Sequence, residues 1–161
     1  MNEILMPAEL TDEIELSYDL LRRDCGLVDL NGKLGLLEVR GDDRKAWLQG
    51  QVTNDMRPLQ VGGASSFCVL QPTGQIIAII DAWRFEDRYL LTVNRSLLEP
   101  LKARLEGAII MEDVQIADLT EEFSFFSIQG PSATRKLSDL VTLPTLDAGI
   151  CEFGKSEITA L

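Results

Sequence analysis

The amino-acid sequence predicts an α+β fold, in which an antiparallel sheet carries helices packed on one face. Three apolar runs between residues 64 and 93 are separated only by short turns, which is typical of consecutive antiparallel strands. Helical spacing is shown by four leucines, Leu97, Leu98, Leu101 and Leu105. A chain of 161 residues without an internal repeat or linker is long enough for one core, so we predict a single domain over residues 1–161.

The first predicted elements are a helix over about residues 12–24, a hairpin of strands 27–30 and 34–39, and a second helix over about residues 43–50. Thr11-Asp12-Glu13 supply N-capping chemistry for the first helix. Asn31-Gly32 is typical of a tight hairpin turn. Gly41-Asp42-Asp43 cap the second helix.

The later predicted elements are strands 64–70, 76–85 and 88–93, a helix over about residues 97–106, strands 114–117 and 123–128, a short helix over about residues 132–140, and a strand over residues 156–161. Pro72-Thr73-Gly74 and Glu86-Asp87 form the turns between the three central strands. Gly107 ends the helix of leucines. The strand-like end of the chain predicts that these residues are an N-terminal fragment, cut before the rest of a longer chain.

The strand over residues 76–85 contains one carboxylate, Asp81, within an apolar run. Strand alternation places Ile79, Asp81 and Trp83 on one face, with Asp81 and Trp83 about 7 Å apart. A carboxylate beside an indole in an apolar wall suits a flat heteroaromatic ligand with polar edges. Asp81 is therefore the strongest candidate for a binding or catalytic residue.

A structural interpretation of the same residues stays open. A carboxylate buried in an apolar sheet costs several kcal/mol unless it is paired. In this interpretation Asp81 lies near a barrel or sheet edge and pairs with an arginine such as Arg84 or Arg57. Asn94 lies where a strand meets a helix. Its first expected role is therefore that of an N-cap, and its second is that of a ligand contact. Thr53-Asn54-Asp55 is typical of a turn.

Composition limits the class of function. A net charge of −11 repels nucleic-acid phosphate, so direct nucleic-acid binding is not expected. No apolar run reaches the roughly 18 residues of a membrane span, and the N-terminus has no signal-peptide pattern, which predicts a cytoplasmic protein without a membrane partner. The chain has no histidine, and its three cysteines have no metal-ligand spacing, so we expect no metal site.

The order of short motifs over about residues 22–135 resembles the aminomethyltransferases, the glycine cleavage system T proteins, together with their YgfZ-type relatives. The resemblance rests on the motifs together rather than on any one of them. They are Arg22 to Asp29, Val39-Arg40-Gly41-Asp42-Asp43, Trp47-Leu48-Gln49, Val52-Thr53-Asn54-Asp55, Gly74-Gln75-Ile76-Ile77, Trp83-Arg84, Val93-Asn94, Glu112-Asp113-Val114 and Ile128 to Ala133.

This resemblance implies a folate-binding domain whose cofactor is tetrahydrofolate, or a folate derivative. In T proteins an aminomethyl group on a lipoyl carrier protein is converted to ammonia and methylene-tetrahydrofolate. The family's two acidic strand positions fall on Ala78 and Ile79, its pterin-lining tyrosine on Trp83, and its V-N asparagine on Asn94. The catalytic aspartate position is thus Ile79. Asp81, two residues further on the same face, is the candidate replacement.

Several functions follow from the resemblance. The first is a YgfZ-like, folate-dependent accessory protein in iron–sulfur cluster maintenance or tRNA modification, because such relatives also lack the acidic pair. The second is a true glycine-cleavage aminomethyltransferase that uses Asp81. The third is a non-catalytic interaction domain whose ligand site has decayed. By analogy of fold alone, a tRNA-modification GTPase is a weaker alternative, and its phosphate loop is absent from these residues.

Overall fold

The computed structural model describes residues 8–139, 142, 149–153 and 156–160, and the chain divides into two compact units. Unit 1 is formed by residues 1–29 and 126–142, and unit 2 by residues 30–125 and 143–161. The single-domain boundary over residues 1–161 stays a prediction. The α+β class with antiparallel sheets is confirmed, and each unit is described below by itself.

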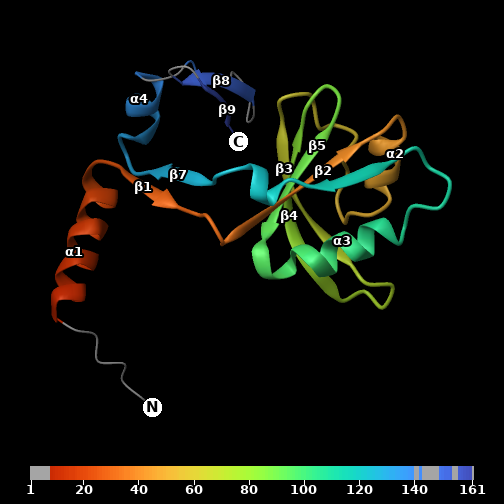
Figure 1. The fold of residues 1–161 in the computed structure, drawn as a ribbon, viewed down its shortest axis with the longest axis horizontal. Helices are drawn as coiled ribbons and strands as arrows, with labels where there is room; N and C mark the ends of the chain where they lie inside the picture. Colours follow the sequence, from red (N-terminus) through yellow and green to blue (C-terminus); the bar gives the residue numbers. More distant parts are fainter. Residues whose placement is uncertain (1–7, 140–141, 143–148, 154–155, 161) are drawn as a thin grey trace, which may run out of the picture. The chain divides into compact units, whose positions relative to one another are not determined.

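Unit 2 is built on a five-stranded antiparallel sheet, visible in Figure 1. Its strands lie in the order β3 (Ala64–Leu70), β4 (Ile76–Arg84), β5 (Tyr89–Asn94), β2 (Leu34–Arg40) and β6 (Gln115–Asp118). The three strands that the sequence predicted between residues 64 and 93 therefore form consecutive hairpins, as expected. Strand β2, from earlier in the chain, pairs with β5, and β6 pairs with the other side of β2 and forms the edge of the sheet.

Two helices cover one face of this sheet. Helix α2 (Arg44–Gln49) contributes Trp47 and Leu48 to the core, and α3 (Leu98–Glu106) contributes a row of leucines, Leu98, Leu101 and Leu105. A single 3-10 turn, η1 (Arg95–Leu97), leads into α3. The predicted leucine stripe is confirmed, because these three α3 leucines are at most 2% exposed.

Strand β4 has one buried face and one outward face. Ala78, Ile80 and Ala82 pack in the core beneath the helices, and all three are at most 1% exposed. Ile79 and Asp81 alternate with them and point to the other side. This alternation is the one predicted from the sequence, because side chains of a strand project to opposite faces in turn.

Unit 1 combines a two-stranded ribbon with two helices. Helix α1 (Ala8–Arg23) leads into β1 (Gly26–Asp29), which pairs with β7 (Phe126–Gln129), and α4 (Ala133–Ser138) follows. The two helical segments are joined where the Lys136 ammonium donates to the Asp24 carboxylate at 2.6 Å and the Ser132 N–H donates to the Asp24 carbonyl at 3.0 Å.

The predicted hairpin between strands 27–30 and 34–39 is wrong. Strand β1 pairs with β7, whereas β2 belongs to the sheet of unit 2. A two-residue hairpin turn of type I′ needs positive φ at both central residues. Gly32 has φ 73°, but Asn31 does not share this conformation. Its side-chain oxygen instead accepts the Phe125 N–H at 2.8 Å.

The remaining differences concern element ends and one strand that was not predicted. Helix α1 begins at Ala8, so Thr11 lies within the helix and is not its cap. The expected strand over residues 123–128 is shorter, because a 3-10 turn, η2 (Thr120–Glu122), precedes it. Near the chain end β8 (Gly149–Phe153) pairs with β9 (Ser156–Ala160), and only the second was predicted. Within the described residues, no helix combines the length and apolar character of a membrane span.

A buried polar contact closes the edge of the sheet at β6. Thr120, which is 7% exposed, accepts the Leu36 N–H on its hydroxyl at 2.9 Å and donates that hydroxyl to Asp118 at 2.5 Å. The Thr120 N–H also donates to the same carboxylate oxygen at 2.9 Å. Partial burial acts to raise the pKa of Asp118, but the Thr120 hydrogen bonds outweigh it, so the pKa lies below its ordinary value of 3.8.

This contact predicts acid sensitivity. A carboxyl group with a lowered folded-state pKa adds stability above its unfolded-state pKa, and that stability is lost as the pH falls through the folded value. We therefore expect wild-type protein to exceed Asp118→Asn in unfolding free energy at pH 7, with the difference shrinking below about pH 4. Urea unfolding of both proteins between pH 7 and pH 3 measures it. A difference that does not change with pH would contradict the role of the Asp118 charge.

Candidate functional site

The sequence-predicted carboxylate lies on the outward face of β4, in a row of polar side chains. In the strand register Asp81 stands opposite Ser66 of β3 and opposite Thr92 of β5. The Ser66 hydroxyl donates to the Asp81 carboxylate at 2.5 Å. The row Ser66–Asp81–Thr92 therefore places one carboxylate between two hydroxyls, with three neighbouring strands each supplying one side chain.

The indole of Trp83 lies on the same face as this row. Its Nε1 donates to the Thr92 hydroxyl at 3.4 Å, and Thr92 is 8% exposed. The indole itself is half-buried, so part of the ring stays accessible while its nitrogen is engaged. An aromatic ring fixed by a hydrogen bond at one edge offers a flat apolar surface in a defined orientation.

Two expectations for Asp81 are wrong, its burial and its pairing with an arginine. Asp81 is exposed rather than buried, because the helices cover only the opposite face of β4. Neither proposed arginine is its partner. The Arg84 guanidinium donates to the Leu59 carbonyl at 2.5 Å, and the Arg57 guanidinium pairs with Asp55 at 2.9 Å. The Asp81 carboxylate thus faces solvent with a hydroxyl donor beside it.

Two further predicted residues lie along the same strands. Ile79 is 63% exposed and stands opposite Cys68, whose thiol is free and half-buried. Asn94 ends β5 and stands opposite Leu34 of β2. The Asn94 side-chain oxygen accepts the Ser96 N–H at 3.0 Å and the Ser96 hydroxyl at 2.8 Å. Its capping interpretation is therefore confirmed.

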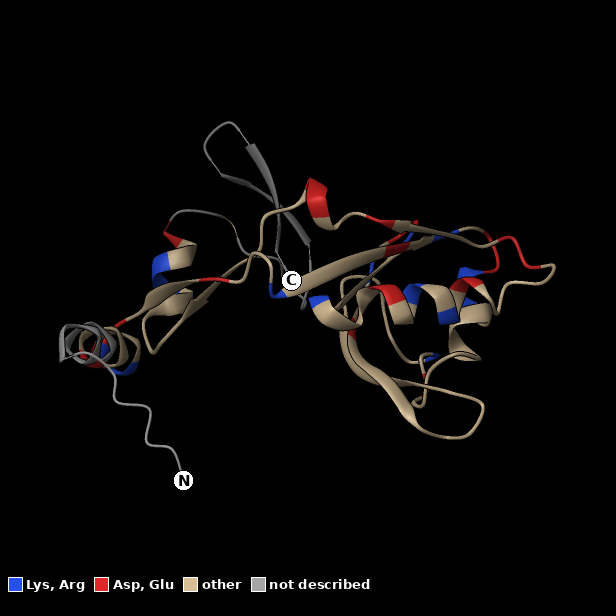
Figure 2. Cartoon of the chain, turned by 60° about the horizontal axis from the view of Figure 1, so that its bottom comes forward, with Lys and Arg blue, Asp and Glu red and all other residues tan. Residues whose placement is uncertain are grey.

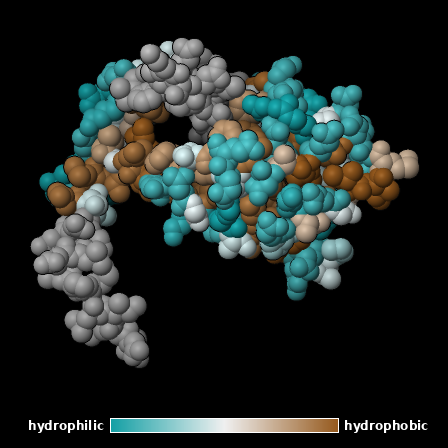
Figure 3. All heavy atoms as spheres, in the orientation of Figure 1, coloured by the Kyte–Doolittle hydropathy of each residue, from teal (hydrophilic) through white to brown (hydrophobic). Residues whose placement is uncertain are grey.

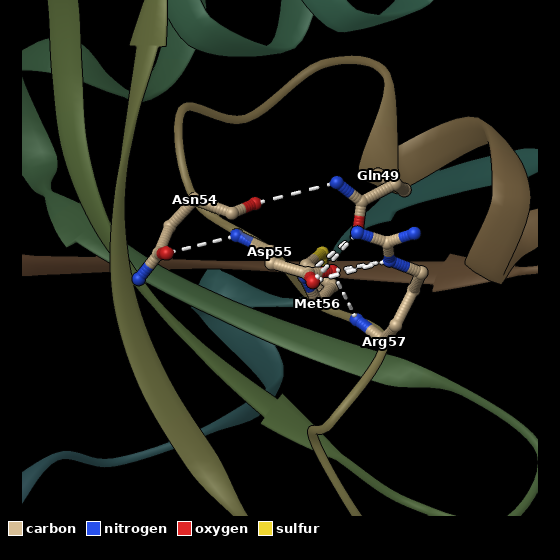
Figure 4. A network of polar contacts seen from close by, with 5 residues as sticks. All are labelled: Gln49, Asn54, Asp55, Met56 and Arg57. Carbon is tan, nitrogen blue, oxygen red and sulfur yellow. Dashed lines mark hydrogen bonds and ion pairs between the residues drawn. The ribbon is translucent and has the colours of Figure 1, made fainter.

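A structured loop borders the site at the edge of β3. The Thr53 hydroxyl accepts the Cys68 N–H at 3.1 Å, and the Thr53 N–H donates to the Cys68 carbonyl at 3.0 Å. Figure 4 shows the rest of the loop folded on its own polar groups. There Gln49 accepts the Met56 N–H at 2.7 Å, and hydrogen bonds from Arg57 lower the pKa of Asp55. The predicted turn at residues 53–55 is confirmed.

The open part of the outward face lies over β3 and β4. Leu36 of β2 and Leu90 of β5 belong to the same face, yet each is only 1% exposed. Ser66, Ile79 and Asp81 are exposed. The accessible surface therefore combines an aliphatic side chain, an indole and a carboxylate. It can stack a planar ring and accept N–H donors from the ring's edge.

Sequence reasoning missed two members of this site, Ser66 and Thr92. The alternation of residues 64–70 and 89–94 puts each of them on a defined face, but their meeting with Asp81 depends on the strand register. Within the described residues, no group of three or more carboxylate or thiol side chains is arranged to hold a metal ion.

Comparison with known protein families gives a match over nearly the whole chain. The family model described as the GCVT N-terminal domain matches residues 5–159. An aminomethyltransferase of Chloroherpeton thalassium is 33% identical over 144 residues, which are 89% of this chain and 39% of the relative. An aminomethyltransferase of Bacillus mycoides is 32% identical over 130 residues, which are 80% of this chain and 35% of the relative.

A solved structure shows the same fold. The glycine cleavage system aminomethyltransferase T from Bartonella henselae matches with a TM-score of 0.74 at 23% sequence identity, covering 90% of this chain and 44% of that chain. The chain thus spans about two fifths of the length of the relatives it matches, between 35% and 44%.

Proposed function

Because this chain belongs to the aminomethyltransferase family through its GCVT N-terminal domain, we propose that its outward β4 face binds tetrahydrofolate or a related reduced folate. The observation that carries the proposal is the pairing of an exposed carboxylate, Asp81, with a half-buried indole, Trp83, on one open face. A pterin is a flat heteroaromatic ring with N–H groups along its edge, so it needs both kinds of surface.

Each residue has a proposed role that its contacts support. Trp83 supplies the stacking surface, and its bond to Thr92 limits the angles the ring can take. Asp81 accepts N–H groups of the pterin, since a carboxylate is a strong acceptor and Ser66 engages only one of its oxygens. Ile79 adds apolar contact beside them. Asn94 contributes by fixing the corner between β5 and η1.

For the whole protein we propose a YgfZ-like, folate-dependent accessory function in iron–sulfur cluster maintenance or tRNA modification. The family's acidic pair falls on Ala78, which is buried in the core, and on Ile79, which is exposed and apolar. A residue that cannot ionise does not move a proton, and removing a general acid or base costs roughly 10²–10⁴-fold in rate. This domain is therefore proposed to bind a folate without performing aminomethyl transfer.

The relatives' name, aminomethyltransferase, favours a second candidate. In a true glycine-cleavage enzyme Asp81 would take the place of the lost acid, and a lipoyl carrier protein would deliver the aminomethyl group. Asp81 lies on the same face as Ile79 and is exposed, which is compatible with such a role. The third candidate, an interaction domain with a decayed site, predicts no folate binding at all.

Calorimetry of the full-length protein with tetrahydrofolate and with folinic acid tests the binding proposal. We expect Trp83→Ala and Asp81→Asn each to weaken binding by about 10-fold or more, because each removes one of the two surfaces that the ring needs. Asp42→Asn, an exposed aspartate in the turn after β2, is the matched control and is expected to leave affinity unchanged. Wild-type protein that binds neither ligand at millimolar concentration would favour the interaction domain.

An activity assay separates the first two candidates. Full-length protein is mixed with tetrahydrofolate and an aminomethylated lipoyl carrier protein, and methylene-tetrahydrofolate is measured. We expect no product above background. Product formation that Asp81→Asn lowers by roughly 10²–10⁴-fold would instead assign the protein to the true aminomethyltransferases. Product formation that Asp81→Asn does not change would remove Asp81 from the mechanism.

A further inference from the structure

The loop between α3 and β6 presents two apolar side chains to solvent. Ile110 is 84% exposed and Met111 is 90% exposed, the two highest values among the large apolar side chains of the described residues. Neither side chain contributes to the core of unit 2, whereas their neighbour Ile109 packs against it. An exposed apolar surface is a candidate interaction site above all where polar residues surround it. We call residues 110–111 the α3–β6 tip.

The tip is held in place by hydrogen bonds at its base. The Glu112 carboxylate accepts the N–H groups of Ile110 at 2.9 Å and of Met111 at 3.0 Å. The Asp113 N–H donates to the Asp43 carboxylate at 2.9 Å, and the Asp42 N–H donates to the Asp113 carboxylate at 3.1 Å. The two apolar side chains are therefore presented on an ordered base, which reduces the entropy lost when a partner binds.

The surroundings of the tip are acidic. Asp42, Asp43, Glu112 and Asp113 are all exposed and meet at the base of the loop. The β4–β5 turn lies at the same end of the sheet, where the Arg44 guanidinium donates to the Glu86 carbonyl at 2.8 Å. Figure 2 shows acidic residues in the loop that follows α3, and Figure 3 shows apolar atoms at the same end of unit 2.

We propose that the α3–β6 tip docks into an apolar pocket on another protein, and that lysine and arginine side chains border this pocket. The apolar pair supplies the buried centre of such a contact, and the surrounding carboxylates supply the charged rim. The acidic rim disfavours other occupants. A second copy would bring like charges together, and both phospholipid surfaces and nucleic acids carry negative charge.

Site-specific photo-crosslinking identifies the occupant. A photoreactive amino acid replaces Met111 in the full-length protein inside its own cells, and the crosslinked residue is located by mass spectrometry. The same amino acid at Ile76, which is 60% exposed at the far end of β4, is the control. We expect a discrete protein adduct at position 111 only, on an apolar surface with basic neighbours. No adduct, an adduct with a second copy or a lipid, or an adduct on an acidic surface would overturn the proposal.

Affinity measurements with the purified partner then test the chemistry of the contact. We expect Met111→Ser with Ile110→Ser to weaken binding by about 10- to 100-fold, and Ile76→Ser to leave it unchanged. Asp42 enters the base of the loop through its backbone N–H, so Asp42→Lys reverses a rim charge while keeping that hydrogen bond. Asp42→Lys should weaken binding several-fold at about 50 mM salt and much less at about 500 mM. If neither the double serine substitution nor Asp42→Lys changed the affinity, the proposed pocket would be wrong.

Discussion

Replacing Gly41 with alanine is expected to lower the unfolding free energy by about 3 kcal/mol or more. Gly41 has φ 107°, a conformation that strongly favours glycine. An added Cβ would lie 2.0 Å from the Asp113 carbonyl oxygen and 2.7 Å from its carbonyl carbon. Both atoms belong to the backbone of the loop that carries the α3–β6 tip. The clash with the added Cβ is relieved only if this loop moves away from β2. Chemical denaturation measures the loss.

Gly74→Ala is the control variant, because it introduces backbone strain at a positive φ without a close contact. Gly74 also has positive φ, 87°, but an added Cβ there would meet nothing within 4 Å. This variant should therefore lose only about 1–2 kcal/mol, the cost of the backbone conformation alone. Equal losses of unfolding free energy in Gly41→Ala and Gly74→Ala would show that the close approach of Gly41 to Asp113 adds nothing to the destabilisation.

Replacing Ile80 with alanine is expected to cost about 3 kcal/mol, within the range of roughly 2–5 kcal/mol for large-to-small changes in a core. Ile80 is 1% exposed and packs with the residues beneath α2 and α3. Removing its outer carbon atoms leaves a cavity that the close-packed sheet and helices fill only in part. The measurement is the midpoint and slope of urea unfolding, with the slope unchanged if the fold is kept.

The neighbouring residue provides the control, because Ile79 faces the other way and is 63% exposed. Ile79→Ala should change stability by less than about 0.5 kcal/mol and weaken folate binding instead. The pair tests the register of β4, since a slip of one residue would exchange the two faces. If Ile79→Ala destabilised the protein more than Ile80→Ala, the outward position of Asp81 would be wrong, and with it the proposed site.

Local signals in the sequence were sufficient for the central part of the fold. The three consecutive strands follow from alternating apolar residues and from short turns, such as the one at Gly74, whose geometry depends on a few neighbouring residues. Helix α3 follows from its leucine spacing and from Gly107 at its end. The faces of β4 were predictable for the same reason, because alternation is a property of the strand itself.

Contacts between distant residues were not predictable in the same way. The pairing of β1 with β7 joins segments about 100 residues apart, whereas Asn31-Gly32 favoured the nearby but incorrect partner. The exposure of Asp81 was missed because the apolar run around it, read alone, does not show that the helices cover only one face. Ser66 and Thr92 were missed because their contacts depend on the register of three strands.

The β1–β7 ribbon has a consequence for the order of assembly. Its strands are separated in the chain by the whole five-stranded sheet, whose last strand ends at Asp118. During synthesis that sheet can therefore form before Phe126 has been added. Until then β1 has no strand to pair with. Closing a preformed stem costs less entropy than closing a free loop of the same length. The Leu30 N–H donates to the Phe125 carbonyl at 2.9 Å and forms such a stem, so the end of β1 and the start of β7 are held within reach of each other.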